Sequence, residues 1–197
     1  MQGTALNVTC RYCDMATADP QLKVWTRDEY YRAADAGLFA GQRVELIDGA
    51  ILMMSPMKAA HAAALELSAT ALRTLFGPRY WIRVQLPLVV SDHSEPEPDI
   101  AIVPGTPRDY PEHPTSALLV VEVSDTTLAF DRGQKRRLYA SAGVADYWVL
   151  NLVDERLEVH RDPVDDDYQT MTTIGPNDDV APLAQPDARI RVRDLLP

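Results

Sequence analysis

The sequence contains no long apolar run and only two cysteines among its 197 residues. A helix that spans a bilayer needs about 20 consecutive apolar residues, and no segment approaches that length. No basic segment followed by an apolar one, the pattern of a secretory leader, opens the chain. We therefore expect a soluble cytoplasmic protein with no membrane partner.

The two cysteines, Cys10 and Cys13, form a lone C-x-x-C pair near the start of the chain. A zinc site would need a second pair or suitably spaced histidines, and a redox motif would need a βαβ context. Neither accompanies the pair, and residues 1–23 show no apolar periodicity. We expect 1–23 to be a flexible N-terminal extension with inert cysteines, in which Met15 is an alternative start. Residues 24–197 have the length of a single domain.

Motifs that mark several large enzyme classes are also missing. The chain has only nine glycines, and they do not form a glycine-rich phosphate loop. No serine lies in the strand-turn-helix setting of a nucleophile elbow. There is no internal repeat and no low-complexity tract. The sequence therefore gives no support to a P-loop nucleotide hydrolase or an elbow-type serine hydrolase.

The chain is acidic, with a formal net charge of −10 at pH 7. This balance argues against broad, non-specific binding to nucleic acid. Ten acidic and two basic residues lie between 151 and 188, which gives that segment a charge of −8 and leaves −2 elsewhere. A basic run precedes it, formed by Arg132, Lys135, Arg136 and Arg137. Such a run is most often a solvated helix face, and a localised phosphate contact is the alternative.

The chemistry of the chain is concentrated between residues 98 and 143. Strands are predicted over 98–103 and 118–123, followed by a helix over 131–142. The second strand is apolar on both sides, which is typical of a buried strand, yet it contains Glu122. Burial of a carboxylate is costly unless it is paired or bound to a metal. Asp99 and Lys135 are the candidates to share its site, and this combination suits a divalent cation and a polarised water.

The other patterns predict an α/β protein (α+β, mixed sheet) with a central mixed sheet of roughly five strands flanked by helices. Thr26 and Glu29 form a capping-box pattern at the start of a helix that ends at Gly37. His61 lies in the first turn of a helix with few charges, where we favour a capping or packing role over a catalytic one. The remaining elements are a hairpin at 43–54, the helix 58–76, a strand 80–90 in which Pro87 marks an edge or bulge, a loop 104–116, a hairpin 146–160, and strands 168–174 and 189–192.

We expect the helix that begins at Lys58 to pack on one face of this sheet. The helix that begins at Asp131 should lie near the carboxylates of Asp99 and Glu122. If those two carboxylates lay on opposite faces of the sheet, they could not form one site.

An ordered series of motifs extends from Thr26 to His160. It comprises Val44-Glu45-Leu46-Ile47-Asp48-Gly49, His61, Glu97-Pro98-Asp99, Val121-Glu122-Val123-Ser124, Asp131-x-x-x-Lys135, Tyr139 and Gly143-Val144-x-x-Tyr147-Trp148. A Pro-Asp pair alone is weak evidence, whereas the complete order is much more specific. The series resembles a large bacterial family described as putative restriction endonucleases, within the PD-(D/E)XK nuclease superfamily.

This resemblance implies a restriction-endonuclease-like core with added β-hairpins and a divalent-metal-dependent endonuclease, with DNA as the favoured nucleic acid. Asp99, Glu122 and the backbone carbonyl of Val123 would then be ligands of Mg²⁺ or Mn²⁺. Two carboxylates and a carbonyl also form, on their own chemistry, a hard oxygen site that leaves positions for water and phosphate.

The superfamily's lysine normally follows the glutamate by two residues, where this chain has Ser124. By the resemblance, members of the family carry it on the following helix instead, which implies Lys135 as the group that orients water or stabilises developing charge. Glu45 matches an additional acid placed before the core hairpin, which could hold a second cation or fix Lys135.

Two further expectations concern assembly and activity. Cleavage of both DNA strands by one small catalytic domain usually needs two active sites, which predicts a two-fold homodimer. We expect the apolar hairpin 147–159 to form its contact surface. The alternative to an enzyme is a catalytically silent, nuclease-like binding or assembly module, in which Glu122 and Lys135 are a buried ion pair.

Overall fold

The computed structural model describes residues 21–197. The predictions for Cys10, Cys13 and Met15, and nearly all of the predicted flexible extension, lie outside the described residues. None of the described helices is long and apolar enough to cross a membrane.

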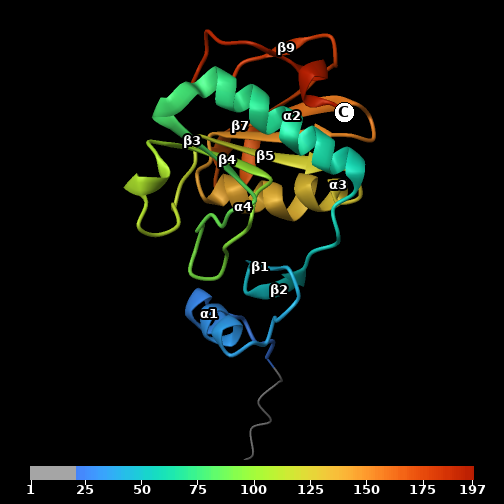
Figure 1. Cartoon of the computed structure of the whole chain (residues 1–197). Coiled ribbons are helices and arrows are strands. Elements are labelled where there is room, and N and C mark those ends of the chain that lie inside the picture. Colours follow the sequence, from blue (N-terminus) through green and yellow to red (C-terminus); the bar gives the residue numbers. More distant parts are fainter. Residues whose placement is uncertain (1–20) are drawn as a thin grey trace, which may run out of the picture.

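The central sheet contains six strands in the order β3-β4-β5-β6-β7-β8; Figure 1 shows where this sheet lies in the molecule. β5 and β6 pair in parallel, and the other neighbours pair antiparallel. The predicted mixed sheet is confirmed, with six strands rather than five. Their bounds are β3 (Tyr80–Val84), β4 (Ile100–Pro104), β5 (Leu119–Ser124), β6 (Asp146–Asn151), β7 (Arg156–Val164) and β8 (Asp167–Ile174).

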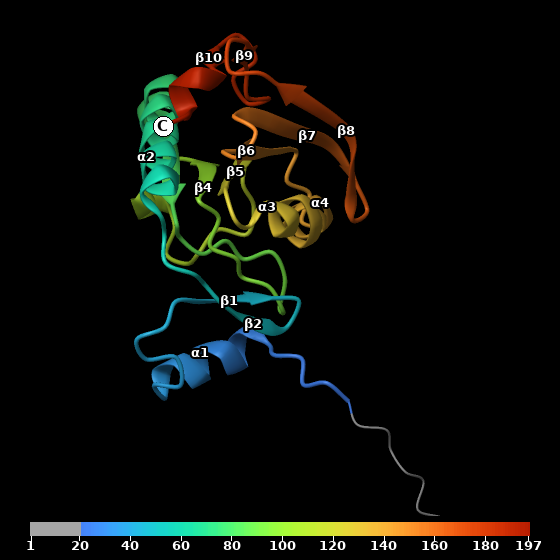
Figure 2. The ribbon, with the colours of Figure 1, turned by 90° about the vertical axis from the view of Figure 1, so that its right-hand side faces the viewer.

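Helices cover both faces of this sheet (Figure 2). The long helix α2 (Ala59–Phe76) covers one face, where its Leu72 packs in a core cluster with Val121 and Val123 of β5. The crossover from β5 to β6 covers the other face with α3 (Leu128–Phe130), the π-helical turn η3 (Asp131–Lys135) and α4 (Arg136–Ser141). Because side chains alternate along a strand, Val120 and Glu122 point to this second face. The predicted places of both helices are confirmed.

A smaller unit lies beside one end of the sheet and contains α1 (Arg27–Asp35), β1 (Val44–Ile47) and β2 (Ala50–Met53) (Figure 1). The predicted capping box is present, since the Glu29 amide donates to Thr26 Oγ1 at 3.2 Å and the Thr26 amide to Glu29 Oε2 at 3.1 Å. The hairpin turn has positive φ at Asp48 and Gly49, as a two-residue turn of this type requires. The Glu95 amide bonds to the Leu46 carbonyl at 2.7 Å, which holds the hairpin against the chain that leads to β4.

Several predicted boundaries were wrong, and one short strand was missed. The strand expected over 80–90 ends at Val84, because Gln85 adopts a φ of 50° and leaves the ladder before Pro87 is reached. The helix expected from Asp131 begins at Leu128. A two-stranded sheet of β9 (Asp179–Val180) and β10 (Ile190–Arg191) was only half predicted, since β9 is too short to show a period. Short helical turns complete the fold: η1 (Gly77–Arg79), η2 (Pro107–Asp109) and η4 (Val192–Leu195).

The prediction that the hairpin 147–159 forms a dimer contact was also wrong. Tyr147, Trp148 and Leu150 are completely buried within one chain. β6 lies between β5 and β7, and its two faces pack into the two core clusters. The apolar run that suggested an interface is therefore a central strand of the fold.

His160 on β7 is a buried histidine on the sheet face that α3, η3 and α4 cover, and its titration can test how that face is packed. Its ring lies 5.6 Å from that of Tyr147 and 5.9 Å from that of Tyr168, and its Nε2 has no hydrogen-bond partner among residues 21–197. Burial lowers its pKa; the charges of Arg136 and Arg132 act in the same direction, and those of Glu158 and Asp167 oppose it. A histidine whose folded-state pKa is lowered destabilises the fold as pH falls below its unfolded-state pKa.

We therefore expect His160→Phe to gain stability relative to wild type as pH falls from 7.5 to 5, because the variant does not bind this proton when it unfolds. Thermal melts of both proteins across that range measure the difference. A constant difference between the two melting temperatures at every pH would contradict the expectation.

Candidate active site

Two carboxylates that are 23 positions apart in the chain meet at the ends of neighbouring strands. The antiparallel register pairs Ile100 with Val121, so its continuation by one residue places Asp99 opposite Glu122. Directly opposed residues of an antiparallel pair have side chains on the same face. The Asp99 amide lies 3.3 Å from Glu122 Oε2. The structure thus brings the two predicted acids together, and their catalytic roles stay predictions.

Lys135 reaches this site from η3, the π-helical turn. Its Nζ lies 2.9 Å from Glu122 Oε1 and 3.7 Å from Glu45 Oε2. π-Helical turns are rare overall. Where one occurs, it is frequently at a functional site. Ser124, at the position where the superfamily's lysine would be expected, instead donates its hydroxyl to Asp131 Oδ2 at 2.7 Å. The amine therefore comes from the crossover helix, at the place predicted for it.

Glu122 is completely enclosed by protein groups. Its Oε1 accepts hydrogen bonds from Lys135 Nζ and, at 2.7 Å, from the hydroxyl of Tyr139 on α4. Burial raises the pKa of Glu122 to about 8, and the charges of Asp99, Asp131 and Glu45 act in the same direction, although the Lys135 ammonium opposes them. Near neutral pH this carboxyl therefore tends to hold a proton, unless more positive charge is brought to the site.

Glu45 enters the site from β1 of the hairpin. Its side chain is buried, and its Oε2 has no hydrogen-bond partner in the described part of the chain. Burial raises the pKa of Glu45, and the nearby Lys135 ammonium lowers it. For Lys135 itself burial lowers the pKa, but the surrounding acids outweigh it and the pKa is raised, so the ammonium stays charged.

Asp99 is held by three donors from different elements. Its Oδ1 lies 3.2 Å from His61 Nε2 and 3.0 Å from the side-chain amide of Gln85, and its Oδ2 accepts the Val123 amide at 2.9 Å. Burial raises the pKa of Asp99, yet His61, Lys135 and the Val123 amide together lower it below its usual value. Asp99 is therefore ionised in the same site in which Glu122 tends to be protonated.

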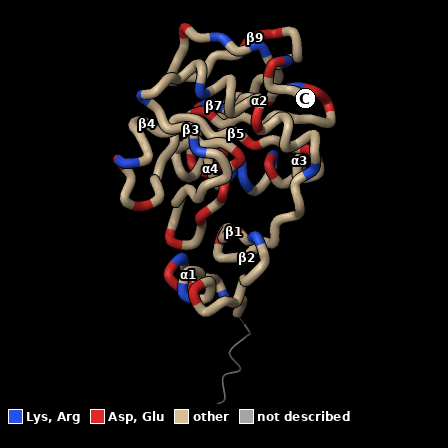
Figure 3. The backbone as a smooth tube through the Cα atoms, in the orientation of Figure 1, with Lys and Arg blue, Asp and Glu red and all other residues tan. Residues whose placement is uncertain are grey.

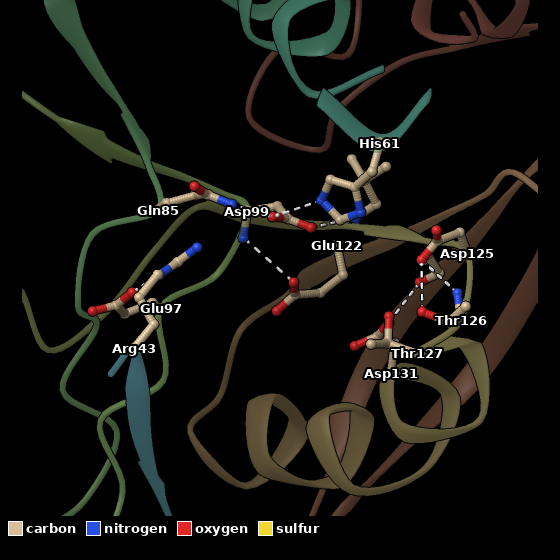
Figure 4. Close-up of polar contacts among 12 residues, drawn as sticks. Arg43, His61, Gln85, Glu97, Asp99, Glu122, Asp125, Thr126, Thr127 and Asp131 are labelled. Carbon is tan, nitrogen blue, oxygen red and sulfur yellow. Dashed lines mark hydrogen bonds and ion pairs between the residues drawn. The ribbon is translucent and has the colours of Figure 1, made fainter. Parts of the chain in front are cut away.

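His61 and Gln85 were missed as site residues by the sequence analysis. His61 was expected to cap or pack its helix, and the structure points it toward Asp99 from the first turn of α2 (Figure 4). The pKa of His61 is raised: burial lowers it, but the hydrogen bond and charge of Asp99 dominate. The signals for His61 were its place in the ordered series of motifs and its position on a helix with few charges, and neither indicates which strand end the helix faces.

These groups line a pocket of about 760 Å³ between the hairpin unit and the end of the sheet. Two ion pairs with partly exposed side chains lie among the residues that line it, and Figure 4 labels Arg43 and Glu97 of the first. Arg43 pairs with Glu97 at 3.0 Å, and Lys58 pairs with Asp125 at 3.4 Å.

The prediction that the basic run is a solvated helix face was partly wrong. Lys135 is buried, Arg132 pairs with Glu158, and Arg136 pairs with Asp167.

The charge balance of the site tests whether a cation would fit it. Four buried acids, Glu45, Asp99, Glu122 and Asp131, surround the single buried ammonium of Lys135. Within residues 21–197, no group of three or more His, Cys, Asp or Glu side chains is arranged so that it could hold a metal ion without further ligands. The excess of hard oxygen donors, and the Glu45 oxygen that has no hydrogen-bond partner among the described residues, nevertheless suit a hard divalent cation that completes its shell with water or phosphate. The residues therefore fit such an ion.

The six-stranded mixed sheet brings two acids together at neighbouring strand ends, and a lysine joins them from the crossover. The chain belongs to the Uma2 family, described as putative restriction endonuclease, whose model matches residues 27–193. The fold is similar to the crystal structure of a putative nuclease belonging to DUF820 from Anabaena variabilis ATCC 29413, with a TM-score of 0.68 and 17% identity over 86% of this chain and 96% of that one. No curated protein matches the chain.

Proposed function

We propose that this protein is a divalent-metal-dependent endonuclease that hydrolyses phosphodiester bonds in DNA. The observation that supports this most is the convergence of Asp99, Glu122 and Lys135 in one pocket with an excess of buried acid. The family description as restriction endonuclease supports DNA as the substrate.

The cation belongs to the same proposal. Asp99 and Glu122, with the backbone carbonyl of Val123, would hold Mg²⁺ or Mn²⁺. When bound, such an ion supplies a Lewis acid for the phosphate and lowers the pKa of water. Its charge also relieves the repulsion among the buried acids, which adds to the effect of burial in raising the pKa of Glu122.

The side chains around the carboxylates have distinct roles in this proposal. Lys135 offers an ammonium, which can only donate, so it stabilises negative charge on the reacting phosphate or orients the attacking water. Glu45 holds that ammonium from the opposite side at 3.7 Å. Tyr139 fixes the orientation of Glu122, and His61 and Gln85 fix that of Asp99.

The deciding experiment is a cleavage assay on purified protein with labelled DNA, in Mg²⁺, in Mn²⁺ and in a chelator. We expect cleavage only with the metal ions, and a loss of at least about a hundredfold in Asp99→Asn. Glu66→Gln is the matched control, because Glu66 is an exposed acid on α2 and its substitution should leave cleavage unchanged. Cleavage that survives in Asp99→Asn would contradict the assignment.

One observation favours a silent binding or assembly module as the second candidate. Both oxygens of Glu122 already have protein partners, namely Lys135, Tyr139 and the Asp99 amide. Such a network can stabilise a fold without any reaction. A protein that neither cleaves DNA nor responds to metal ions would support this candidate.

We further propose that residues 24–197 act as one domain, in a cytoplasmic homodimer that brings two active sites to the two DNA strands. Light scattering should report a dimer at the concentrations at which cleavage is measured. A monomer at all of them would contradict the proposed assembly and leave the chemistry of the site untouched.

A further inference from the structure

Methionine is concentrated at the pocket. Of the four methionines in residues 21–197, Met53, Met54 and Met57 line it, and Met171 does not. Met53 is 72% exposed and Met57 is 39% exposed. Leu52, Pro56 and Phe130 extend the same apolar wall. Methionine is flexible and polarisable, and it is overused at surfaces that bind varied apolar partners.

Cationic groups at the pocket are few. The described lining residues include Lys135 within the site and Arg43 and Lys58 at the rim. Each rim cation is paired with one acid and stays about half exposed. Figure 3 shows Lys and Arg positions scattered along the backbone rather than gathered in one segment. A protein that holds a duplex by its phosphates commonly uses six to ten such contacts, which this pocket does not offer.

The carboxylates also lie deep. Glu122 is only 2% exposed, so a phosphodiester must enter the pocket to reach it. An unpaired nucleotide can place its base against an apolar wall while its phosphate enters, because the base is free to leave the stack. A base-paired nucleotide would first have to be unpaired and unstacked, which costs a few kcal/mol.

From the methionine wall, the two rim cations and the depth of the carboxylates, we propose that the pocket takes an unpaired DNA strand. The base packs against Met53, Met54 and Met57, and Arg43 and Lys58 contact the flanking phosphates. This inference rests on the proposed endonuclease function and specifies its substrate class. Affinity then comes mainly from the base, and two phosphate contacts predict a shallow salt dependence, with a slope of about −1.4 in log K against log salt.

The test compares one sequence as a single strand, as a duplex and as a duplex with an internal unpaired bubble. We expect the single strand and the bubble to be cleaved at least about tenfold faster than the duplex, with cuts confined to unpaired positions. Met53→Ala/Met57→Ala should raise the KM for the single strand by about tenfold, because the base then buries less apolar surface. Met53→Leu/Met57→Leu should preserve the wall, and Met171→Ala is the control for an exposed methionine elsewhere, at 58% exposure.

A DNA-binding measurement can test this inference even if the proposed endonuclease function is wrong. Fluorescence anisotropy with a labelled single strand, the same duplex and an abasic strand needs no cleavage. Preference for the single strand that is lost both in the double alanine variant and with the abasic strand supports the inference, even if nothing is cleaved. Equal or absent binding of single strand and duplex would overturn it, as would cleavage of the duplex at the same rate.

Discussion

Substitution of Lys135 by Met is expected to lower the free energy of unfolding by about 3–5 kcal/mol. The side chain is buried, and its Nζ lies 2.9 Å from Glu122 and 3.7 Å from Glu45. Its loss leaves four buried acids without their ammonium, whereas methionine keeps most of the volume, so the effect reports charge rather than a cavity. Denaturant unfolding of the metal-free variant and wild type measures it.

The stability lost in Lys135→Met should depend on pH, and the state of Glu122 sets the direction of that dependence. The folded-state pKa of Glu122 is already about 8, above its unfolded value, and removal of the ammonium raises it further. A carboxyl with a raised folded-state pKa favours the fold at low pH, and this contribution is lost as pH rises through the folded-state pKa. The difference between Lys135→Met and wild type should therefore grow between pH 6 and pH 9.

A double-mutant cycle isolates the pair. Glu122→Gln in the Lys135→Met background removes the carboxyl that must otherwise be protonated, so the double variant should regain part of the lost stability at pH 9 and little at pH 6. Cleavage should fall by at least about a hundredfold in Lys135→Met, since no ammonium then faces the reacting phosphate. Equal stability of Lys135→Met and wild type at pH 9 would contradict the role of this pair.

The sequence patterns predicted which acids and which lysine meet in the pocket, but they did not predict the groups that surround them. Glu122 was conspicuous because a carboxylate interrupts an apolar strand, and the position of Lys135 followed from the order of motifs. The register that places Asp99 opposite Glu122 depends on which strands pair, and no local pattern encodes that choice. The contact of His61 with Asp99 likewise depends on where α2 meets the sheet.

The errors have a common physical origin. The hairpin 147–159 was taken for a contact surface because apolar and aromatic residues suit both an interface and a core, and only the six-stranded sheet decides between them. The π-helical turn η3 has no known composition signal, yet it sets the direction from which Lys135 approaches. Local sequence thus predicted the elements well, and their assembly determined the site.

Metal binding is the second large effect, and thermal melts with and without Mg²⁺ or Mn²⁺ measure it. An ion at 100 times its dissociation constant stabilises the fold by about 2.7 kcal/mol, which corresponds to a rise of roughly 5–11 °C in Tm for a chain of this size. Asp99→Asn and Glu122→Gln should abolish this rise. The metal-free stability of Glu122→Gln should equal or exceed that of wild type, because burial and the nearby acids raise the pKa of Glu122. Asp99→Asn should lose some metal-free stability, because His61, Lys135 and the Val123 amide hold the pKa of Asp99 below its usual value.

Lys135→Met should show the opposite pattern, with a lower metal-free Tm and a metal-induced rise at least as large as that of wild type. An ammonium has no lone pair to bind the ion, and the ion supplies positive charge where the ammonium was lost. Glu66→Gln, the exposed control on α2, should follow wild type in both conditions. If wild type shows no metal-induced rise while Lys135→Met is strongly destabilised, the buried pair acts as a structural ion pair, and the silent-module candidate replaces the nuclease.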